Sequence, residues 1–348
     1  MRPLSRRGFL FGAGAGSLGV LGGRLLERAE EVPAALAAGA AEAAAGPAHA
    51  TQYGPSHEAH GTVGRAANPW PAGKGMDPAK FLTTFDTGAV TRLPNGRVQR
   101  EYRITALDAE IQVAPGVWFP AWTYNGTVPG PTLRCTVGDA LKIHFFNEAS
   151  HPHTIHFHGI HPANMDGVFE QVPPGGRFTY EFPAEPFGAF LYHCHTMPVK
   201  KHIHKGLYGA FIVDPPTPRP KATEFVMVMN GFDTDLDGEN EFYTVNGVAN
   251  YYAERPIPLK VGEPVRIYLV NVTEFDLINS FHLHANMFRL YRTGTSLTHY
   301  ELTDTVMLCQ GERCLLEFTY RTPGRYMFHA HQSEFAELGW MGFFDVTA

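Results

Sequence analysis

This chain lacks several features that would place it in common classes of binding or secreted protein. Its 348 residues include 28 Lys and Arg against 34 Asp and Glu, a formal net charge of −6, and no run of basic residues. This composition gives no indication of nucleic-acid binding or of a membrane-binding patch. Only four cysteines are present, and they do not form the disulfide framework of a small secreted domain.

Long amphipathic helices are also missing from residues 81–348. Short runs rich in Val, Ile, Phe and Tyr alternate there with polar residues and end at Gly, Pro, Asn or Asp, as residues 266–270 and 315–320 illustrate. The hydrophobic content of 44% is ample for two cores at this length. The pattern predicts an all-β protein built from two Greek-key sandwiches or barrels.

The N-terminus contains an apolar stretch, up to about Gly23, that is too short and too glycine-rich for a stable membrane span. Arg6 and Arg7 precede it, which is typical of a twin-arginine export signal, although a chance Arg-Arg pair is the alternative. We therefore expect residues 1–50 to direct export, so that the protein is periplasmic, cell-surface or secreted. Residues 51–80, with many Gly, Pro and Ala, are interpreted as an extended arm.

The chain repeats itself over a period of more than a hundred residues. Residues 138–147 match residues 262–271 in their starting Gly and acid, their apolar alternation and their final Asn. Such a period is too long for a solenoid and indicates two copies of one domain. The Pro-rich segment 215–223 is interpreted as a stiff linker, which predicts domains at 81–214 and 224–348.

Four His-X-His pairs occur within these two predicted domains. In an extended strand, residues i and i+2 point to the same face, so each pair offers two imidazoles to one partner. Neutral imidazole is a preferred ligand for copper, zinc, iron and nickel. A single pair would most often be a solvated or hydrogen-bonded strand, but four pairs predict a multinuclear metal centre. The pairs are His156 and His158, His193 and His195, His282 and His284, and His329 and His331.

Cys194 differs from the other three cysteines because histidines flank it on both sides. A thiolate with two imidazoles in a trigonal arrangement forms a blue-copper electron-transfer site. His153, before the first pair, and His202, eight residues after Cys194, are placed to complete such a site. His204 is a competitor for His202. Leu207 occupies the axial position, which is often Met, and a non-coordinating side chain there should raise the reduction potential.

Five segments of the chain carry patterns that occur together in one family of copper enzymes: His153–Gly159, His193–His195, His202–Leu207, Asn125–Pro131 and Met165–Gly167. They resemble the copper signatures of multicopper oxidases, and the resemblance covers about residues 100–348. In domain 2, Asn279, Ala330 and Phe335 occupy the positions of the blue-copper ligands. A cysteine in the first of two domains resembles the two-domain, laccase-like branch, which is related to copper nitrite reductases. Two cupredoxin-like Greek-key β-sandwich domains are thereby implied.

The resemblance implies four copper ions per subunit, one of them the blue, type 1 copper. His153, Cys194 and His202 would bind this copper, with Leu207 as the axial non-ligand. Asp166 matches the acidic residue that lies near the type 2 copper in the family, where it orients water and assists proton delivery. The alternative for Asp166 is a turn residue in Met-Asp-Gly.

The paired histidines are implied to form a trinuclear cluster. His156 and His282, one from each domain, would bind the single type 2 copper. Glu334 and Glu337 follow the fourth pair and could relay protons, although surface or packing roles are the simpler interpretation. The two type 3 coppers would be bound by His158, His193, His195, His284, His329 and His331.

The implied activity is oxidation of a small reducing substrate, one electron at a time, coupled to four-electron reduction of dioxygen to water. A phenol, an aromatic amine or a metal ion would serve as this substrate, but no Met-rich segment indicates a specialised cuprous-ion oxidase. One alternative is a copper nitrite reductase that produces nitric oxide, because the spacing from Cys194 to His202 is longer than is common in the oxidases. A copper-binding or electron-carrier protein is a second alternative. Neither needs His195 together with both domain 2 pairs.

The resemblance also implies an oligomer. If both domains present equivalent faces outward, the histidine pairs of one subunit cannot readily converge. In two-domain relatives, domain 1 of one subunit meets domain 2 of the next, which implies a homotrimer with a cluster at each interface. Dioxygen and the reducing substrate are the other expected partners, and neither a nucleic acid nor a membrane span in the mature chain is expected.

The remaining cysteines carry no metal motif. Cys309 and Cys314 flank four residues that are interpreted as a hairpin, and a local disulfide there would be compatible with export. Two free thiols are the simpler interpretation, because hairpin geometry often strains such a bond. Cys135 is expected to be a plain core residue.

Overall fold

The computed structural model describes residues 77–348, and in that range no helix is long and apolar enough to cross a membrane. The expected export signal and the expected arm up to residue 76 lie outside the described residues. The end of the arm contains α1 (Pro78–Phe81), a single turn that Asp77 caps by accepting the N–H of Ala79 at 3.0 Å. Proline is favoured at the first helical position because the N–H that it lacks has no partner there.

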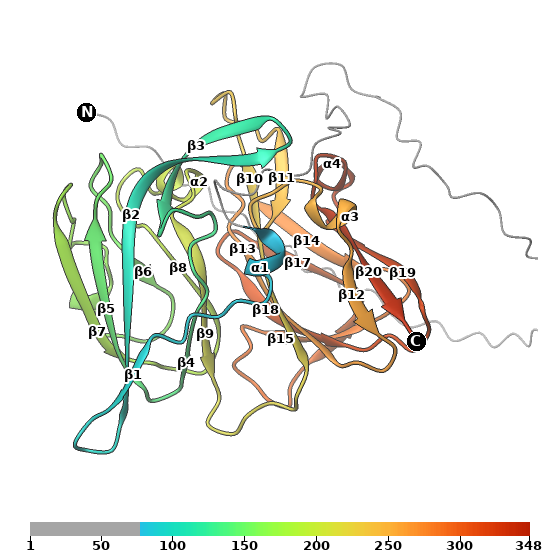
Figure 1. Ribbon diagram of the computed structural model, residues 1–348, viewed down its shortest axis with the longest axis horizontal. Helices are drawn as coiled ribbons and strands as arrows, with labels where there is room; N and C mark the ends of the chain where they lie inside the picture. The colour runs from blue at the N-terminus through green and yellow to red at the C-terminus, as the bar shows by residue number, and fades with distance from the viewer. Residues whose placement is uncertain (1–76) are drawn as a thin grey trace, which may run out of the picture. The chain divides into compact units, whose positions relative to one another are not determined.

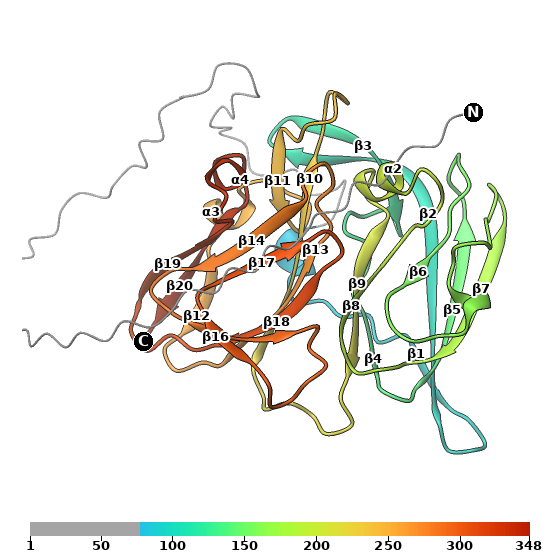
Figure 2. The same cartoon turned by 180° about the vertical axis from the view of Figure 1, so that it is seen from behind.

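The first half of the described chain folds into two β-sheets (Figures 1 and 2). One sheet has the order β1-β2-β5-β7, with β3 paired to β2, and the other has the order β4-β9-β8-β6. Ile143, Phe157 and Phe211 belong to the buried cluster between them. The 3-10 helix η1 (Ala163–Met165) follows β6, and α2 (Val199–His204) connects β8 to β9. The strands are β1 (Ala89–Arg92), β2 (Val98–Ala114), β3 (Val117–Tyr124), β4 (Leu133–Thr136), β5 (Ala140–Asn147), β6 (His156–Phe157), β7 (Arg177–Pro183), β8 (Gly188–His193) and β9 (Tyr208–Asp214).

The second half follows the same plan. A six-stranded sheet has the order β11-β10-β13-β18-β15-β16, and a five-stranded sheet has the order β12-β20-β19-β14-β17. Phe281 and Phe328 lie in the core between them with their ring centroids 5.9 Å apart. α3 (Tyr251–Glu254) follows β11, and α4 (Ser333–Glu337) follows β19. The strands are β10 (Thr223–Phe232), β11 (Phe242–Val245), β12 (Ile257–Lys260), β13 (Val265–Asn271), β14 (Ile278–Leu283), β15 (Phe288–Arg292), β16 (Glu301–Thr303), β17 (Thr305–Cys309), β18 (Arg313–Phe318), β19 (Gly324–His329) and β20 (Met341–Thr347).

Strand pairing in the two halves is equivalent. β2 pairs in parallel with β5 as β10 does with β13, and β4 pairs in parallel with β9 as β12 does with β20. His156 stands opposite His193 in one half, and His282 stands opposite His329 in the other. The predicted all-β fold of two β-sandwich domains is therefore confirmed, and equivalent strands carry the histidine pairs.

An apolar cluster joins the two sandwiches. It includes Leu191 of β8 and Ile212 of β9 from the first domain, and Val226 of β10, Tyr268 of β13 and Leu315 of β18 from the second. All of these side chains are buried. Reorienting one sandwich against the other would expose this apolar surface to water, so the cluster opposes such motion.

Ion pairs stabilise the connection between the domains. β9 ends at Asp214 and β10 begins at Thr223, and Arg134 forms ion pairs on both sides of the connection, with Asp214 at 2.8 Å and Glu224 at 2.7 Å. Leu82, expected near the start of domain 1, packs instead in the core of domain 2, and its carbonyl accepts a hydrogen bond from β10 at 2.9 Å. By packing, the segment around α1 therefore belongs with the second domain.

The predicted hairpin between Cys309 and Cys314 is wrong. Cys309 ends β17 in the five-stranded sheet, whereas Cys314 lies in β18 of the six-stranded sheet, so the turn between them passes from one sheet to the other. The N–H of Gly311 in this turn donates to the carbonyl of Asn271 at 2.9 Å. Cys309 is exposed and Cys314 is buried, and both are free thiols, as is the buried Cys135.

Candidate metal centre

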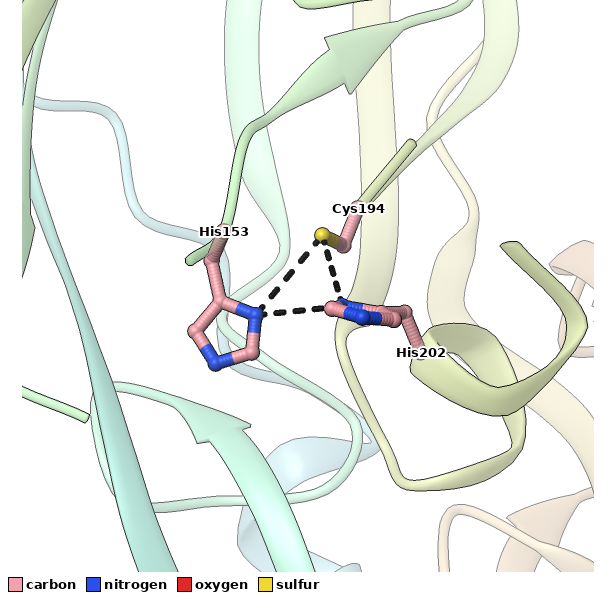
Figure 3. A group of neighbouring side chains, drawn as sticks. All are labelled: His153, Cys194 and His202. Atoms are coloured by element: carbon pink, nitrogen blue, oxygen red, sulfur yellow. Dashed lines mark hydrogen bonds between the residues drawn. The ribbon is translucent and has the colours of Figure 1, made fainter. Parts of the chain in front are cut away.

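Three donor atoms from separate parts of the sequence meet in the core of domain 1 (Figure 3). Nδ1 of His202 lies 3.2 Å from Sγ of Cys194, Nδ1 of His153 lies 3.9 Å from that sulfur, and the two nitrogens are 3.1 Å apart. All three side chains are buried. One thiol sulfur and two imidazole nitrogens in one place are the donor set of a blue-copper site, so these residues fit a copper ion.

Neighbouring elements position these three side chains. His153 forms an isolated bridge just before β6, Cys194 directly follows β8, and His202 lies in α2. The N–H of Cys194 donates to the carbonyl of Leu207 at 3.0 Å, so the loop that contains α2 closes back on the cysteine. Gly206 has a φ of +115°, and a Cβ there would lie 2.4 Å from a valine side chain, so this closure requires glycine.

Burial keeps both histidines of this site neutral. It lowers the pKa of His153 to about 3, with the neighbouring His202 adding to the effect, and it lowers the pKa of His202 to about 4. Burial raises the pKa of the Cys194 thiol, although the N–H of Thr154, 3.4 Å from Sγ, favours the thiolate. Neutral imidazoles keep a lone pair for a metal, and metal binding would displace the thiol proton.

The structure separates the two candidate loop histidines. His204 is buried away from the sulfur, where its Nε2 accepts the backbone N–H of Asp233 at 3.0 Å. Its ring contacts the rings of Phe119 and Phe275, with centroids 5.4 and 4.8 Å away. Only His202 of the two therefore faces Cys194. The side chain of Leu207 is fully buried in the same core cluster as the cysteine.

The paired histidines of domain 1 form a second group, and Cys194 lies between two of them in the sequence. Nε2 of His158 is 3.2 Å from Nε2 of His193, and the ring centroid of His156 lies 5.1 Å from those of both. The ring centroid of His195 is 5.3 Å from that of His156. Because alternate residues of an extended segment share a face, β6, β8 and the residues that directly follow them present four imidazoles on one side of the sheet.

Asp166 fixes the orientation of the His156 ring through contacts with its Nδ1 atom. Nδ1 of His156 lies 2.8 Å from the carbonyl of Asp166 and 3.0 Å from its carboxylate, which leaves Nε2 for a metal. The next residue, Gly167, has a φ of +72°, and a Cβ there would lie 2.0 Å from the carbonyl of Ile155, so the turn needs glycine. Nε2 of His161, a histidine outside the four pairs, also lies 3.6 Å from the Asp166 carboxylate.

Domain 2 repeats this arrangement. Nε2 of His284 is 2.9 Å from Nε2 of His329, and the ring centroid of His282 lies 5.3 Å from that of His331. Nδ1 of His282 lies 3.0 Å from the carbonyl of Asp304, as that of His156 does beside Asp166. Each domain therefore contributes four imidazoles. In each domain a backbone carbonyl contacts Nδ1 of the first histidine, His156 or His282.

The two groups of four are separate within the chain. Among residues 77–348, the candidate metal-binding groups combine histidines of one domain only. His284 and His331 of domain 2 are exposed, whereas the domain 1 histidines are buried or half-buried. Burial lowers the pKa of His158 to about 3, with His193 and then Arg313 of domain 2 adding to the effect. The turn at Gly311 thus borders the domain 1 group, but it brings no imidazole to it.

The equivalent of the cysteine site in domain 2 is filled by packing. The side-chain amide of Asn279 donates to the hydroxyl of Thr273 at 3.0 Å, and the ring of Phe335 stacks on Tyr243 at 3.8 Å. Ala330 is buried and offers no donor. Glu334 and Glu337 are exposed on α4, and within the described chain neither belongs to a metal-binding group.

Comparisons with known proteins agree with this arrangement. Family models described as multicopper oxidase match residues 108–218 and 218–348. A solved structure described as a multicopper oxidase is 54% identical, covers 79% of this chain and 98% of its own, and superposes with a TM-score of 0.78. A copper nitrite reductase from Nitrosomonas europaea is 26% identical, with 72% and 94% covered and a TM-score of 0.67.

Curated relatives include nitrite reductases. The copper-containing nitrite reductase of Neisseria gonorrhoeae is 29% identical over 250 residues, which cover 66% of this chain and 63% of the relative. The chain thus spans slightly less than two thirds of the length of the first curated relatives that it matches.

Proposed function

Because this chain belongs to the multicopper oxidase family, we propose that it oxidises a small reducing substrate at the Cys194 site and reduces dioxygen to water at a three-copper cluster. The proposal rests on one observation, the groups of cysteine and histidine side chains that could bind metal ions. One buried group holds a cysteine and two histidines, and each domain also holds a group of three histidines beside a fourth imidazole ring.

The proposed copper ligands follow from these groups. His153, Cys194 and His202 would hold the type 1 copper, with Leu207 at the axial position. The type 2 copper would be held by His156 and His282, and the type 3 pair by His158, His193, His195, His284, His329 and His331. When bound, the type 1 copper accepts single electrons, and the three-copper cluster supplies the four-electron reduction of dioxygen.

The protein itself contributes neutral ligands, fixed orientation and a short connection between the sites. Burial keeps the type 1 imidazoles unprotonated, and the carbonyl of Asp166 fixes the outer nitrogen of His156. Cys194 stands between His193 and His195, so the backbone links the buried sulfur to two ligands of the cluster. The carboxylate of Asp166, beside His156, is placed to hold a proton for transfer to reduced oxygen.

We also propose that the active form is a homotrimer in which domain 1 of one subunit meets domain 2 of the next. Two separate groups of four imidazoles within one chain support this assembly, because a cluster with ligands from both domains needs a second copy. Export through the twin-arginine route, suggested by Arg6 and Arg7, is proposed on the sequence alone.

A copper nitrite reductase is the second candidate, since relatives with that description are 29% identical. His195 and both histidine pairs of domain 2 favour the oxidase, because a mononuclear catalytic copper does not require them. The test is oxygen uptake by copper-loaded protein with phenols, aromatic amines, Mn(II), Fe(II) and Cu(I) as donors. We expect four electrons consumed per dioxygen and no hydrogen peroxide. Nitric oxide release from nitrite without oxygen uptake would reverse the assignment.

A further inference from the structure

His161 contacts both the strand that carries proposed copper ligands and the loop that carries Asp166. Its Nε2 atom lies 2.7 Å from the carbonyl oxygen of Phe157, the residue between His156 and His158. A carbonyl oxygen can only accept a hydrogen bond, so Nε2 carries the hydrogen and donates it. The same Nε2 lies 3.6 Å from the Asp166 carboxylate. The N–H of His161 therefore faces the strand and the acid together.

Packing fixes the His161 ring in this orientation. Its side chain is only 7% exposed, whereas that of Asp166 is 33% exposed. The His161 ring lies beside Phe182 of β7, with the centroids 5.4 Å apart, and beside His156 at 6.2 Å. Among the polar contacts of residues 77–348, the Asp166 carboxylate has two, with His156 and with His161. Because water can reach this carboxylate, a buried N–H next to it favours the rotamer that faces the protein over rotamers that face solvent.

The repeat in domain 2 provides an internal comparison. His282 is the first histidine of its pair, and its Nδ1 lies 3.0 Å from the carbonyl of Asp304. The Asp304 carboxylate, however, accepts the hydroxyl of Thr305 at 3.0 Å, and that hydroxyl occupies the second contact of His282 Nδ1 at 2.8 Å. Met287 stands three residues after the second histidine of the pair, where domain 1 has His161. Of these two acids, only the one with a histidine N–H beside it turns its carboxylate to the ligand ring.

We propose that His161 is a positioning residue for oxygen reduction, and that its N–H turns the Asp166 carboxylate toward His156 and away from solvent. A carboxylate against Nδ1 makes the imidazole a stronger electron donor to a metal bound at Nε2. The same placement keeps the carboxylate available to hold the proton that the proposed function assigns to it. His161 also fixes the peptide between His156 and His158 through the carbonyl of Phe157. The inference rests on the proposed function.

The first experiment tests the position of the Asp166 carboxylate without turnover. Crystal structures of the copper-loaded parent, His161→Met and His161→Gln are compared. Met copies the residue at the equivalent position of domain 2, and Gln has nearly the same length but keeps an N–H group. We expect the contact between the Asp166 carboxylate and Nδ1 of His156 to be lost in the Met variant and kept in the Gln variant. A Met variant that keeps this contact overturns the proposal.

The second experiment separates the two half-reactions of the copper-loaded protein by stopped flow. Ascorbate reduces the blue copper under argon, and oxygen then restores the blue band. His161→Met should slow the oxygen step about tenfold and alter the type 2 copper hyperfine splitting in the electron paramagnetic resonance spectrum, but leave the ascorbate step unchanged. His161→Gln should recover the rate and the spectrum. An oxygen step as fast in the Met variant as in the parent, or equally slow in both variants, contradicts the proposal.

His144→Met is the matched control. His144, on β5, also lies 3.6 Å from a carboxylate, that of Glu101, but it belongs to no candidate metal-binding group in the described chain. The control should match the parent in both half-reactions, and a control as slow as His161→Met would overturn the proposal. His161→Asn replaces the Met variant if that variant does not fold, because the shorter amide cannot reach Asp166. Absence of an oxygen step in the parent overturns the proposed function, and the crystal structures then decide the role of His161.

Discussion

At the scale of single residues, the proposed type 1 site depends on a sulfur atom in apolar surroundings. Cys194 and Leu207 are both fully buried, and the sulfur accepts hydrogen bonds from Thr154, whose backbone N–H lies at 3.4 Å, and from Thr196. Hydrophobic surroundings and hydrogen bonds to the sulfur tune the potential of a blue-copper site. Substitutions at these positions should therefore change spectrum and potential before they change the fold.

Cys194→Ser should abolish the intense thiolate-to-copper absorption band and reduce oxidation of every donor to background. The hydroxyl oxygen is a much poorer copper ligand than the thiolate, while the histidine groups of both domains remain intact. Visible spectroscopy, copper content and oxygen uptake measure the effect. A blue band that survives the substitution would place the type 1 copper elsewhere.

Leu207→Met should lower the reduction potential of the blue copper and slow oxidation of donors with high potentials, because a thioether can act as a weak axial ligand. Redox titration of the blue band measures the shift. Leu207→Ile is the control, since it keeps an apolar side chain of the same size and should leave the potential close to that of the parent protein. An identical potential in all three proteins means that residue 207 is not axial.

Glu274 should make stability depend on pH. Burial raises its pKa from 4.5 to about 7, and the nearby Lys200 opposes the rise. Since the folded protein binds this proton more tightly than the unfolded chain, the contribution to stability is present below pH 4.5 and is lost as pH rises through about 7.

The substitution Glu274→Gln should remove that pH dependence. Relative to the parent, the free energy of unfolding of the variant should increase by on the order of 1 kcal/mol as the pH rises from 5 to 8. This figure already includes a reduction for partial solvent screening of the side chain. Urea unfolding at the two pH values measures it. Glu337→Gln, an exposed control, should show no such trend, and a parent and variant that change in parallel with pH would rule out Glu274 as the source.

At the scale of elements, α2 positions the His202 ligand and is itself held by domain 2. The carbonyl of Glu274 accepts a hydrogen bond from Asn240, and the adjacent Phe275 lies under Lys200 of α2 at 4.0 Å and beside His204. The backbone N–H of Asp233 donates to His204 from the end of β10. The helix that carries one of the proposed copper ligands is therefore packed against loops from the other domain.

His204→Phe should destabilise the protein by about 1–3 kcal/mol, because the N–H of Asp233 would stay buried without an acceptor. A loosened α2 should also alter the copper hyperfine splitting in the electron paramagnetic resonance spectrum of the blue site. His204→Gln keeps an acceptor and should recover most of both properties. Loss of stability with an unchanged spectrum in the Phe variant would show that α2 does not position His202 through this contact.

At the scale of the whole molecule, the proposed assembly follows from the separation of the two histidine groups. The apolar cluster between the domains includes buried residues of both sandwiches, so the domains of one chain cannot turn to bring the groups together without exposing it. The homotrimer proposed above would instead place the domain 1 group of one copy against the exposed domain 2 group of another.

Mixed assemblies should therefore restore activity between two inactive chains. A chain with His156 and His158 both replaced by Ala, and another with His282 and His284 both replaced by Ala, should each fail to reduce oxygen. After joint refolding, some interfaces would combine an intact domain 1 group with an intact domain 2 group, and a fraction of the parent oxygen uptake should return. If confirmed mixed trimers with blue copper stay inactive, the cluster must form within one chain.

The sequence by itself determined the two-domain β architecture and the grouping of the histidines. Alternation along a strand places residues two apart on one face, so His156 and His158 were expected on the same face, and the repeat period predicted two equivalent sandwiches. The position of Cys194 between two histidines likewise singled out one sulfur. These conclusions depend only on local backbone geometry and on adjacency along the chain, both of which can be inferred from the sequence.

Only the tertiary structure decided between His202 and His204. Both lie in α2, and residues two apart on a helix point to nearly opposite sides, so one faces Cys194 and the other faces Asp233. No sequence motif indicated a role for Trp122, because its contact with two proposed copper ligands, His153 and His202, forms only when the core packs. The interpretation of residues 309–314 as a hairpin failed for the same reason. Turn residues indicate that the chain reverses, but long-range packing determines which sheet the next strand joins.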